Sequence, residues 1–154
     1  KSMKKILKKD LFTVTFDKCF EEVICACGDV RDETWISEKF VETYTKLYDM
    51  GIAHSVEVWN GKRLVGGLYG LSLGKMFFGE SMFSIETNSS KIALIKLCEY
   101  LREKNYYVVD CQVHNSHLES MGAREIERSE FLKILENQIN KKGKYSKWDI
   151  QDKK

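Results

Sequence analysis

Residues 77–84 read Phe77-Phe78-Gly79-Glu80-Ser81-Met82-Phe83-Ser84, and residues 108–112 read Val108-Val109-Asp110-Cys111-Gln112. Each stretch places one carboxylate among apolar neighbours, which is costly unless the charge is paired, hydrogen-bonded or used in function. Side chains alternate between the two faces of a strand, so Asp110 and Gln112 are predicted to share one face. These two residues are therefore either catalytic or hydrogen-bonded residues at the end of a strand, and Glu80 is the other residue to explain.

The pattern along the whole chain predicts an α+β domain. Period-two alternation predicts strands at 12–16, 54–59, 63–70, 76–83, 106–112 and, briefly, 124–126. Apolar residues spaced three and four apart predict helices at 2–9, from 17 to Gly28, from 38 to Gly51, from 89 to Asn105, and from 129 onward. Asp17 is expected to cap the second of these helices, and Asn60-Gly61 predicts a tight hairpin turn. The result is a mixed, largely antiparallel sheet flanked by helices.

The composition indicates a single soluble domain. The chain has 154 residues, about the length of one domain, and charged residues interrupt every apolar segment, so no membrane span is expected. The basic N-terminus is not followed by an apolar segment with a cleavage site, which favours a cytoplasmic protein. His114 and His117 lack the further ligands of a metal site, so no metal is expected. Residues 141–154 are polar and rich in Lys, and a solvated tail is predicted there.

Further motifs resemble those of one known family. They are Ala53-His54-Ser55-Val56-Glu57-Val58-Trp59, Gly66-Gly67-Leu68-Tyr69-Gly70, Ser90-Lys91 and Ser120-Met121-Gly122-Ala123-Arg124-Glu125-Ile126. Together with the two stretches above, they closely resemble motifs of the bacterial leucyl/phenylalanyl-tRNA-protein transferases, in the family's order over most of residues 34–135. The resemblance implies an acetyltransferase-like (GNAT-like) catalytic domain at 1–140, without the family's small N-terminal domain.

The resemblance also implies an activity. Members of the family move leucine or phenylalanine from its tRNA onto proteins whose N-terminal residue is Arg or Lys, and thereby create a degradation signal (an N-degron). The expected partners are leucyl-tRNA, phenylalanyl-tRNA and such acceptor proteins, and the expected state is a monomer. Because the ester of the aminoacyl-tRNA is already activated, no ATP, metal or other cofactor is expected.

The expected catalytic residues are Asp110, Gln112 and Glu80. Formation of a peptide bond requires removal of a proton from the attacking amine and stabilisation of an anionic tetrahedral intermediate. Asp110 either orients Gln112 or accepts the amine proton, and Gln112 positions either the amine or the carbonyl. Glu80 is expected to bind either the α-amino group of the donor or the cationic acceptor.

The expected substrate contacts lie in three groups. By motif match, an apolar pocket for the donor side chain comprises Leu68, Phe77, Leu97 and Leu101, although Leu97 and Leu101 have the spacing of ordinary core residues. Trp35, Tyr44 and Asn115 are expected near the 3′ end of the tRNA, the two aromatic rings by stacking or as core residues. Lys4, Lys5, Lys8 and Lys9 share one helical arc and either contact tRNA phosphates or form a solvated face.

Two other functions are compatible with the sequence. An acyl-CoA acyltransferase is disfavoured, because Glu86-Thr87-Asn88-Ser89-Ser90-Lys91 precedes the long helix without the glycines of a pyrophosphate-binding turn. A non-catalytic module that binds tRNA or protein N-termini is the alternative of a different class. The presence of Glu80, Asp110 and Gln112 together favours the enzyme, since binding alone does not require this set.

Overall fold

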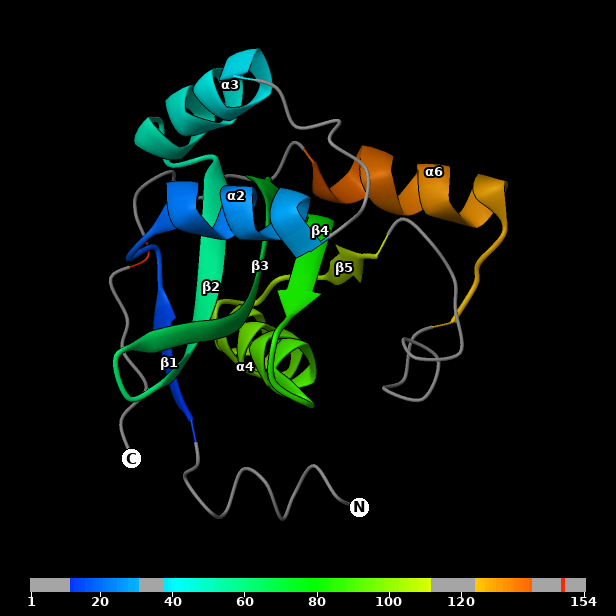
Figure 1. Ribbon diagram of the computed structural model, residues 1–154. Helices are drawn as coiled ribbons and strands as arrows, with labels where there is room; N and C mark the ends of the chain where they lie inside the picture. The colour runs from blue at the N-terminus through cyan, green and yellow to red at the C-terminus, as the bar shows by residue number, and fades with distance from the viewer. Residues whose placement is uncertain (1–11, 31–37, 112–123, 140–147, 149–154) are drawn as a thin grey trace.

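The computed structural model describes residues 12–30, 38–111, 124–139 and 148, which form a five-stranded sheet between helices (Figure 1). The strands are β1 (Thr13–Phe16), β2 (Ala53–Asn60), β3 (Arg63–Leu73), β4 (Met76–Ser84) and β5 (Val108–Asp110), in that order across the sheet. The helices are α2 (Phe20–Val30), α3 (Glu38–Asp49), α4 (Ser89–Glu103) and α6 (Arg128–Gln138). Only β5 is parallel to its neighbour, which confirms the predicted mixed, largely antiparallel α+β sheet.

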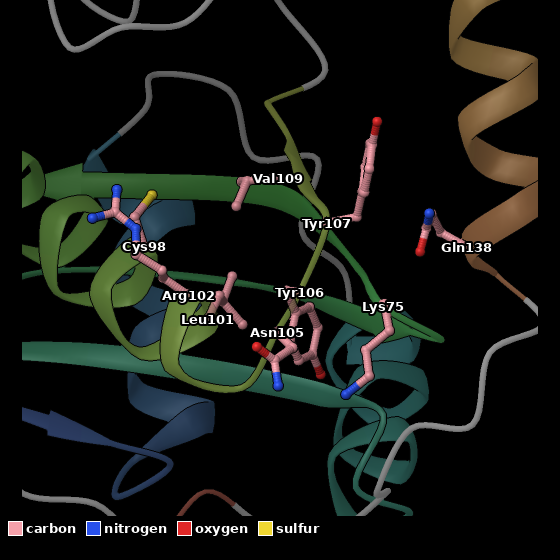
Figure 2. A pocket seen from close by; sticks show the side chains of 9 residues that line it. All are labelled: Lys75, Cys98, Leu101, Arg102, Asn105, Tyr106, Tyr107, Val109 and Gln138. Atoms are coloured by element: carbon pink, nitrogen blue, oxygen red, sulfur yellow. The ribbon is translucent and has the colours of Figure 1, made fainter.

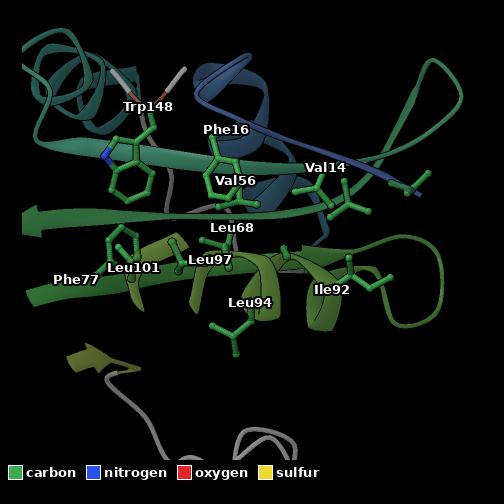
Figure 3. Packing of buried hydrophobic residues seen from close by; sticks show 13 residues of the cluster. Val14, Phe16, Val56, Leu68, Phe77, Ile92, Leu94, Leu97, Leu101 and Trp148 are labelled. Carbon is green, nitrogen blue, oxygen red and sulfur yellow. The ribbon is translucent and has the colours of Figure 1, made fainter. Parts of the chain in front are cut away.

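Each face of the sheet has its own apolar core. On one face, α4 packs its apolar stripe against alternate residues of β1 to β4, among them Val56, Leu68 and Phe77 (Figure 3). On the other face, α2 and α3 cover a second cluster that includes Ile24 and Tyr69. Full burial of one large apolar side chain contributes about 1.5–3 kcal/mol. The two cores therefore fix which face each side chain of β3 and β4 occupies.

The turn signals of the sequence are confirmed. Gly61 (φ 64°) lies in the hairpin between β2 and β3, Gly51 (φ 79°) follows α3, and Asn105 (φ 61°) follows α4. Helix α2 continues past Gly28 to Val30, and the structure has no strand at 124–126, so these two predictions are wrong. The predicted helix at 2–9 lies outside the described residues. Of the helices described, none is both long and apolar enough to span a membrane.

Asp17 does not cap α2, contrary to the sequence prediction. Its backbone has a positive φ of 55°, and its carboxylate is turned towards the sheet. Oδ1 accepts the backbone N–H of Ser55 at 2.8 Å, and Oδ2 lies 2.7 Å from Nδ1 of His54. The hydrogen bonds to the neighbouring strand outcompete the local capping arrangement that the sequence favours.

Trp148 corrects the prediction of a solvated tail at 141–154. It is only 5% exposed and packs in the α4 core, where its ring stacks on His54 with centroids 3.7 Å apart and an interplanar angle of 4°. Its backbone N–H donates to Oδ2 of Asp17 at 2.7 Å. Burial of this large aromatic side chain removes much apolar surface from water, and the polar composition of the segment does not prevent it, so the prediction is wrong at this residue.

Glu57 is a buried acid on β2, where it pairs with Thr15 of β1. Its carboxylate accepts hydrogen bonds from Thr15, Ser55 and the backbone N–H of Lys18. Burial is the largest effect and raises the pKa of Glu57 above 4.5, although these three hydrogen bonds act in the opposite direction. The folded state therefore holds this proton more tightly than the unfolded chain does.

The free energy of unfolding is expected to decrease as the pH rises from 4.5 through the higher pKa of Glu57 in the folded state. A Glu57→Gln variant should lose this part of the decrease, because the amide does not ionise. Urea denaturation of both proteins, from about pH 4 to about pH 8, measures the difference. Glu103→Gln, at an exposed acid of α4, is the matched control. An identical pH dependence in the wild type and in Glu57→Gln would contradict the prediction.

Candidate active site

Glu80 is the extra residue of a β-bulge in β4. Tyr69 of β3 pairs with Ser81, whereas the next residue, Gly70, pairs with Gly79, so Glu80 has no partner in the register. A bulge of this kind bends the strand and re-aims one side chain. Gly70 allows the close approach of the strands, because an ideal Cβ there would lie 2.2 Å from the carbonyl oxygen of Phe78.

Asp110 lies on the neighbouring strand, beside the bulge. It is the last residue of β5 and pairs in parallel with Phe78, and the pairing between β4 and β5 covers three residues of each strand. Phe78 pairs with Leu71, which packs in the core of α2 and α3, so alternation places the Asp110 side chain on that same face. The backbone of Gly79 is close as well, with its ideal Cβ 3.5 Å from the Asp110 carbonyl oxygen.

Tyr44 links helix α3 to this edge of the sheet. Its ring stacks on Phe40 at 4.5 Å and meets Tyr69 edge to face at 5.7 Å, and its hydroxyl donates to the carboxylate of Glu80. Burial, and then the charge and hydrogen bond of Glu80, raise the pKa of Tyr44 to about 12. Tyr44 therefore remains a neutral hydrogen-bond donor at physiological pH. Three predicted site residues, Tyr44, Glu80 and Asp110, thus gather on one face of the sheet.

Cys111 follows Asp110 and packs against the α4 core. Burial, followed by the charge of Asp110, raises the pKa of its thiol. A thiol that remains protonated is a poor nucleophile. Among the described residues, this edge therefore offers carboxylates and a phenol for chemistry, and these groups suit acid–base catalysis and the binding of cations.

The four residues of the predicted donor pocket lie together on the opposite face, where α4 packs on the sheet. Leu68, Phe77, Leu97 and Leu101 belong to one cluster and are 1–3% exposed. This is the packing of core residues, and the pocket role of the four remains a prediction.

A cavity of about 620 Å³ adjoins that cluster (Figure 2). Leu101 and Cys98 of α4 and Val109 of β5 form its apolar part, whereas Lys75 and Arg102 supply positive charge. Val109 directly precedes Asp110, so the cavity reaches the strand that carries the predicted catalytic acid. The sequence pattern did not single out Val109, although its alternation with Asp110 places it on the α4 face.

The remaining predicted residues, Gln112, Trp35, Asn115 and Lys4, Lys5, Lys8 and Lys9, lie outside the described residues. Among the described residues, no group of three or more His, Cys, Asp or Glu side chains is arranged to hold a metal ion.

Comparison with known proteins assigns the chain to a family. The family model described as leucyl/phenylalanyl-tRNA protein transferase matches residues 1–136. The chain belongs to this family. A leucyl/phenylalanyl-tRNA–protein transferase of Flavobacterium johnsoniae is 55% identical over 141 residues, which cover 89% of this chain and 66% of the relative. That of Thermodesulfovibrio yellowstonii is 48% identical over 153 residues, which cover 97% of this chain and 63% of the relative. The chain thus spans just under two thirds of the length of these leucyl/phenylalanyl-tRNA–protein transferases.

Solved structures show that this member of the transferase family has the acetyltransferase fold. An aminoglycoside acetyltransferase from an uncultured soil metagenomic sample aligns with a TM-score of 0.64 and 14% identity, over 77% of this chain and 92% of the other. An acetyltransferase of Trypanosoma brucei aligns with a TM-score of 0.54 and 15% identity, over 76% and 95% of the two chains. At such low identity the likeness concerns the fold, and it confirms the predicted GNAT-like architecture.

Proposed function

We propose that this chain carries the catalytic part of an aminoacyltransferase, which moves leucine or phenylalanine from aminoacyl-tRNA onto the N-terminal Arg or Lys of a protein and so creates an N-degron. One observation carries the proposal: Glu80 and Asp110, from adjacent strands, occupy the same face at the point where the pairing of β4 and β5 ends. Membership of the transferase family supports the assignment of these carboxylates to chemistry. Since tRNA is a cytoplasmic substrate, the cytoplasm is the proposed place of action.

In the proposed reaction, the amine of the acceptor attacks the ester carbonyl of the aminoacyl-tRNA. The nitrogen loses a proton, a tetrahedral oxyanion forms, and the 3′-terminal ribose hydroxyl of the tRNA leaves with a proton. Asp110 accepts the amine proton or orients Gln112, which positions the amine or the carbonyl. The ester supplies the driving force, so the proposal requires neither ATP nor a metal.

Glu80 is proposed to bind a substrate ammonium group. A bulge holds this carboxylate in place, and the Tyr44 hydroxyl occupies part of its hydrogen-bonding capacity and restricts its orientation. The remaining lone pairs suit the α-ammonium group of the donor or the cationic side chain of the acceptor.

The donor side chain is proposed to enter on the α4 face. The short pairing of β4 with β5 supports a substrate that lies at this edge of the sheet, with its ester near Asp110 and its side chain towards the apolar cluster. The cavity beside Leu101 and Val109 supports the same direction. Leu68, Phe77 and Leu97 would then form the wall of the pocket, which small movements of α4 adapt to leucine or phenylalanine.

The tRNA is proposed to bind through its 3′ end and its phosphates. Tyr44, with Trp35 and Asn115, would hold the terminal adenosine, and the stripe of Lys4, Lys5, Lys8 and Lys9 would contact the phosphates. The exposed part of the Tyr44 ring supports stacking, since this side chain is only partly buried.

Removing the Tyr44 ring is expected to weaken binding of aminoacyl-tRNA, whereas removing its hydroxyl is not. Stacking of a base on an aromatic ring contributes about 1–3 kcal/mol, so Tyr44→Ala should raise the Kd by roughly 5- to 150-fold. Tyr44→Phe keeps the ring and is the matched variant. Filter binding with non-hydrolysable leucyl-tRNA measures both. Equal affinity of the Ala and Phe variants would show that Tyr44 is a core residue.

The function is tested by transfer of labelled leucine from leucyl-tRNA to three peptides that begin with Lys, Arg or Asp. The chain is assayed alone and with the part of the F. johnsoniae relative that it does not match, and that complete relative is the positive control. Transfer restricted to the Lys and Arg peptides supports the proposal, and a requirement for the added segment assigns part of substrate binding to it. If neither format transfers leucine although tRNA still binds, the chain is a binding module and the proposal of an enzyme is wrong.

A further inference from the structure

Helix α3, which carries Tyr44, is attached one turn further along, at Tyr48, to the segment that connects β1 and α2. The hydroxyl of Tyr48 donates to the backbone carbonyl of Asp17 at 2.7 Å, and its ring stacks on Phe20 with centroids 4.7 Å apart. Residues four apart lie on the same side of a helix. Tyr44 and Tyr48 therefore lie on the same side of α3, so a movement of Tyr48 also moves Tyr44.

Asp17 is itself held by its carboxylate, which is 1% exposed. The carboxylate contacts the Ser55 N–H at 2.8 Å, Nδ1 of His54 at 2.7 Å and the Trp148 N–H at 2.7 Å. A positive φ is unfavourable for a residue other than glycine and persists only where the surroundings enforce it. These three contacts enforce it here, and they fix the direction of the carbonyl that Tyr48 binds.

Trp148 closes the arrangement from the α4 side. Its ring stacks flat on His54, and it also contacts Phe16, Phe77 and Tyr100. The backbone N–H of Trp148 donates to Oδ2 of Asp17, the same oxygen that faces Nδ1 of His54. A continuous series of contacts therefore runs from Trp148 through Asp17 and Tyr48 to α3.

We propose that Asp17 is a positioning residue of the candidate active site: it ties the docked Trp148 to α3 and thereby holds Tyr44 against Glu80. The inference rests on the proposed function for the importance of the Tyr44–Glu80 contact. It explains why a buried carboxylate, whose desolvation is costly, stands at this place in the fold. In this proposal, the contacts of Asp17 orient Tyr44 without touching the substrate, whereas Glu80 and Asp110 contact the substrate.

The test follows Tyr44 directly and requires no transfer activity. 3-Fluorotyrosine is placed at position 44 of the full chain, and its ¹⁹F chemical shift is recorded without tRNA. Glu80→Gln defines the shift of a Tyr44 that has lost its carboxylate partner. Tyr48→Phe and Asp17→Asn are then compared with it. Tyr48→Phe keeps the ring stacked on Phe20 and therefore preserves the core. This variant still provides the test if Asp17→Asn fails to fold.

The expected result is that both variants move the resonance by more than half of the displacement produced by Glu80→Gln. Tyr100→Phe is the control, because it removes a hydroxyl beside Trp148 on α4 and not on α3. An unchanged resonance in Tyr48→Phe would overturn the proposal, and so would an equal displacement in Tyr100→Phe. If the transfer assay fails while the resonance moves as expected, the proposed activity is wrong and the positioning role of Asp17 is upheld.

Discussion

Transfer by an Asp110→Ala variant is expected to be about 10²- to 10⁴-fold slower than transfer by the wild-type chain, with binding of aminoacyl-tRNA retained. Asp110 ends β5 on the face that carries Glu80, where a carboxylate can reach an amine bound at the edge of the sheet. Its removal takes away the proton acceptor or the group that orients Gln112, but no proposed contact to the tRNA. Single-turnover transfer and filter binding measure the two properties separately.

The Asp110→Asn variant distinguishes the two roles of Asp110. An amide oxygen still accepts a hydrogen bond and can orient Gln112, but it cannot take up the amine proton at neutral pH. Substantial activity of the Asn variant would support orientation, and activity as low as that of Asp110→Ala would support proton acceptance. Glu103→Ala, at an exposed acid on α4, is the control and should transfer normally. Normal transfer by Asp110→Ala would exclude Asp110 from the mechanism.

A Gly70→Ala variant is expected to lose about 1–3 kcal/mol of stability and nearly all transfer activity. The new Cβ would lie 2.2 Å from the carbonyl oxygen of Phe78 and 2.7 Å from the ring of Phe77. The strand can relieve this overlap only by moving β4 away from β3. Phe78 pairs with Asp110 and precedes the bulge at Glu80, so the same movement displaces both carboxylates.

Gly79→Ala is the matched variant for stability. The two glycines pair with each other across β3 and β4, but among the described residues an ideal Cβ on Gly79 meets only the Asp110 carbonyl oxygen at 3.5 Å, an ordinary contact. Urea denaturation of the two variants measures the difference in the free energy of unfolding. If Gly70→Ala were as stable as Gly79→Ala, the close approach at Gly70 would not be a determinant of this fold.

The parts of the fold that local chemistry decides could be predicted from the sequence. Asn60-Gly61 specifies a hairpin whatever surrounds it, and Asn105 tolerates the left-handed conformation that ends α4. The alternation around Asp110 predicts the face of a side chain, but not which residues lie opposite. The sequence therefore indicated Glu80 and Asp110 as unusual, whereas the bulge that brings Glu80 to the edge required the register of β3 and β4.

The parts that depend on distant residues could not be predicted. Asp17 has the local pattern of a helix cap, yet its partners are a strand residue and Trp148, which no local propensity reveals. Trp148 lies in a segment of lysines whose composition is typical of a solvated tail. Leu97 and Leu101 have the same spacing whether they line a pocket or fill a core, and here they are buried in the core of α4.

The contact between Asp17 and Trp148 joins residues 131 positions apart, and this has a consequence for synthesis of the protein. The ribosome synthesises the chain from the N-terminus, so β1 and α2 leave the exit tunnel long before Trp148, which packs beside β1 and Asp17. Until residue 148 has left the exit tunnel, the carboxylate of Asp17 lacks one donor and His54 lacks the ring that covers it. The nascent chain can pair β1 with β2 early, but this face of the sheet acquires its final packing only after residue 148 has been synthesised, and a message that stops short of this codon yields a domain with an open core.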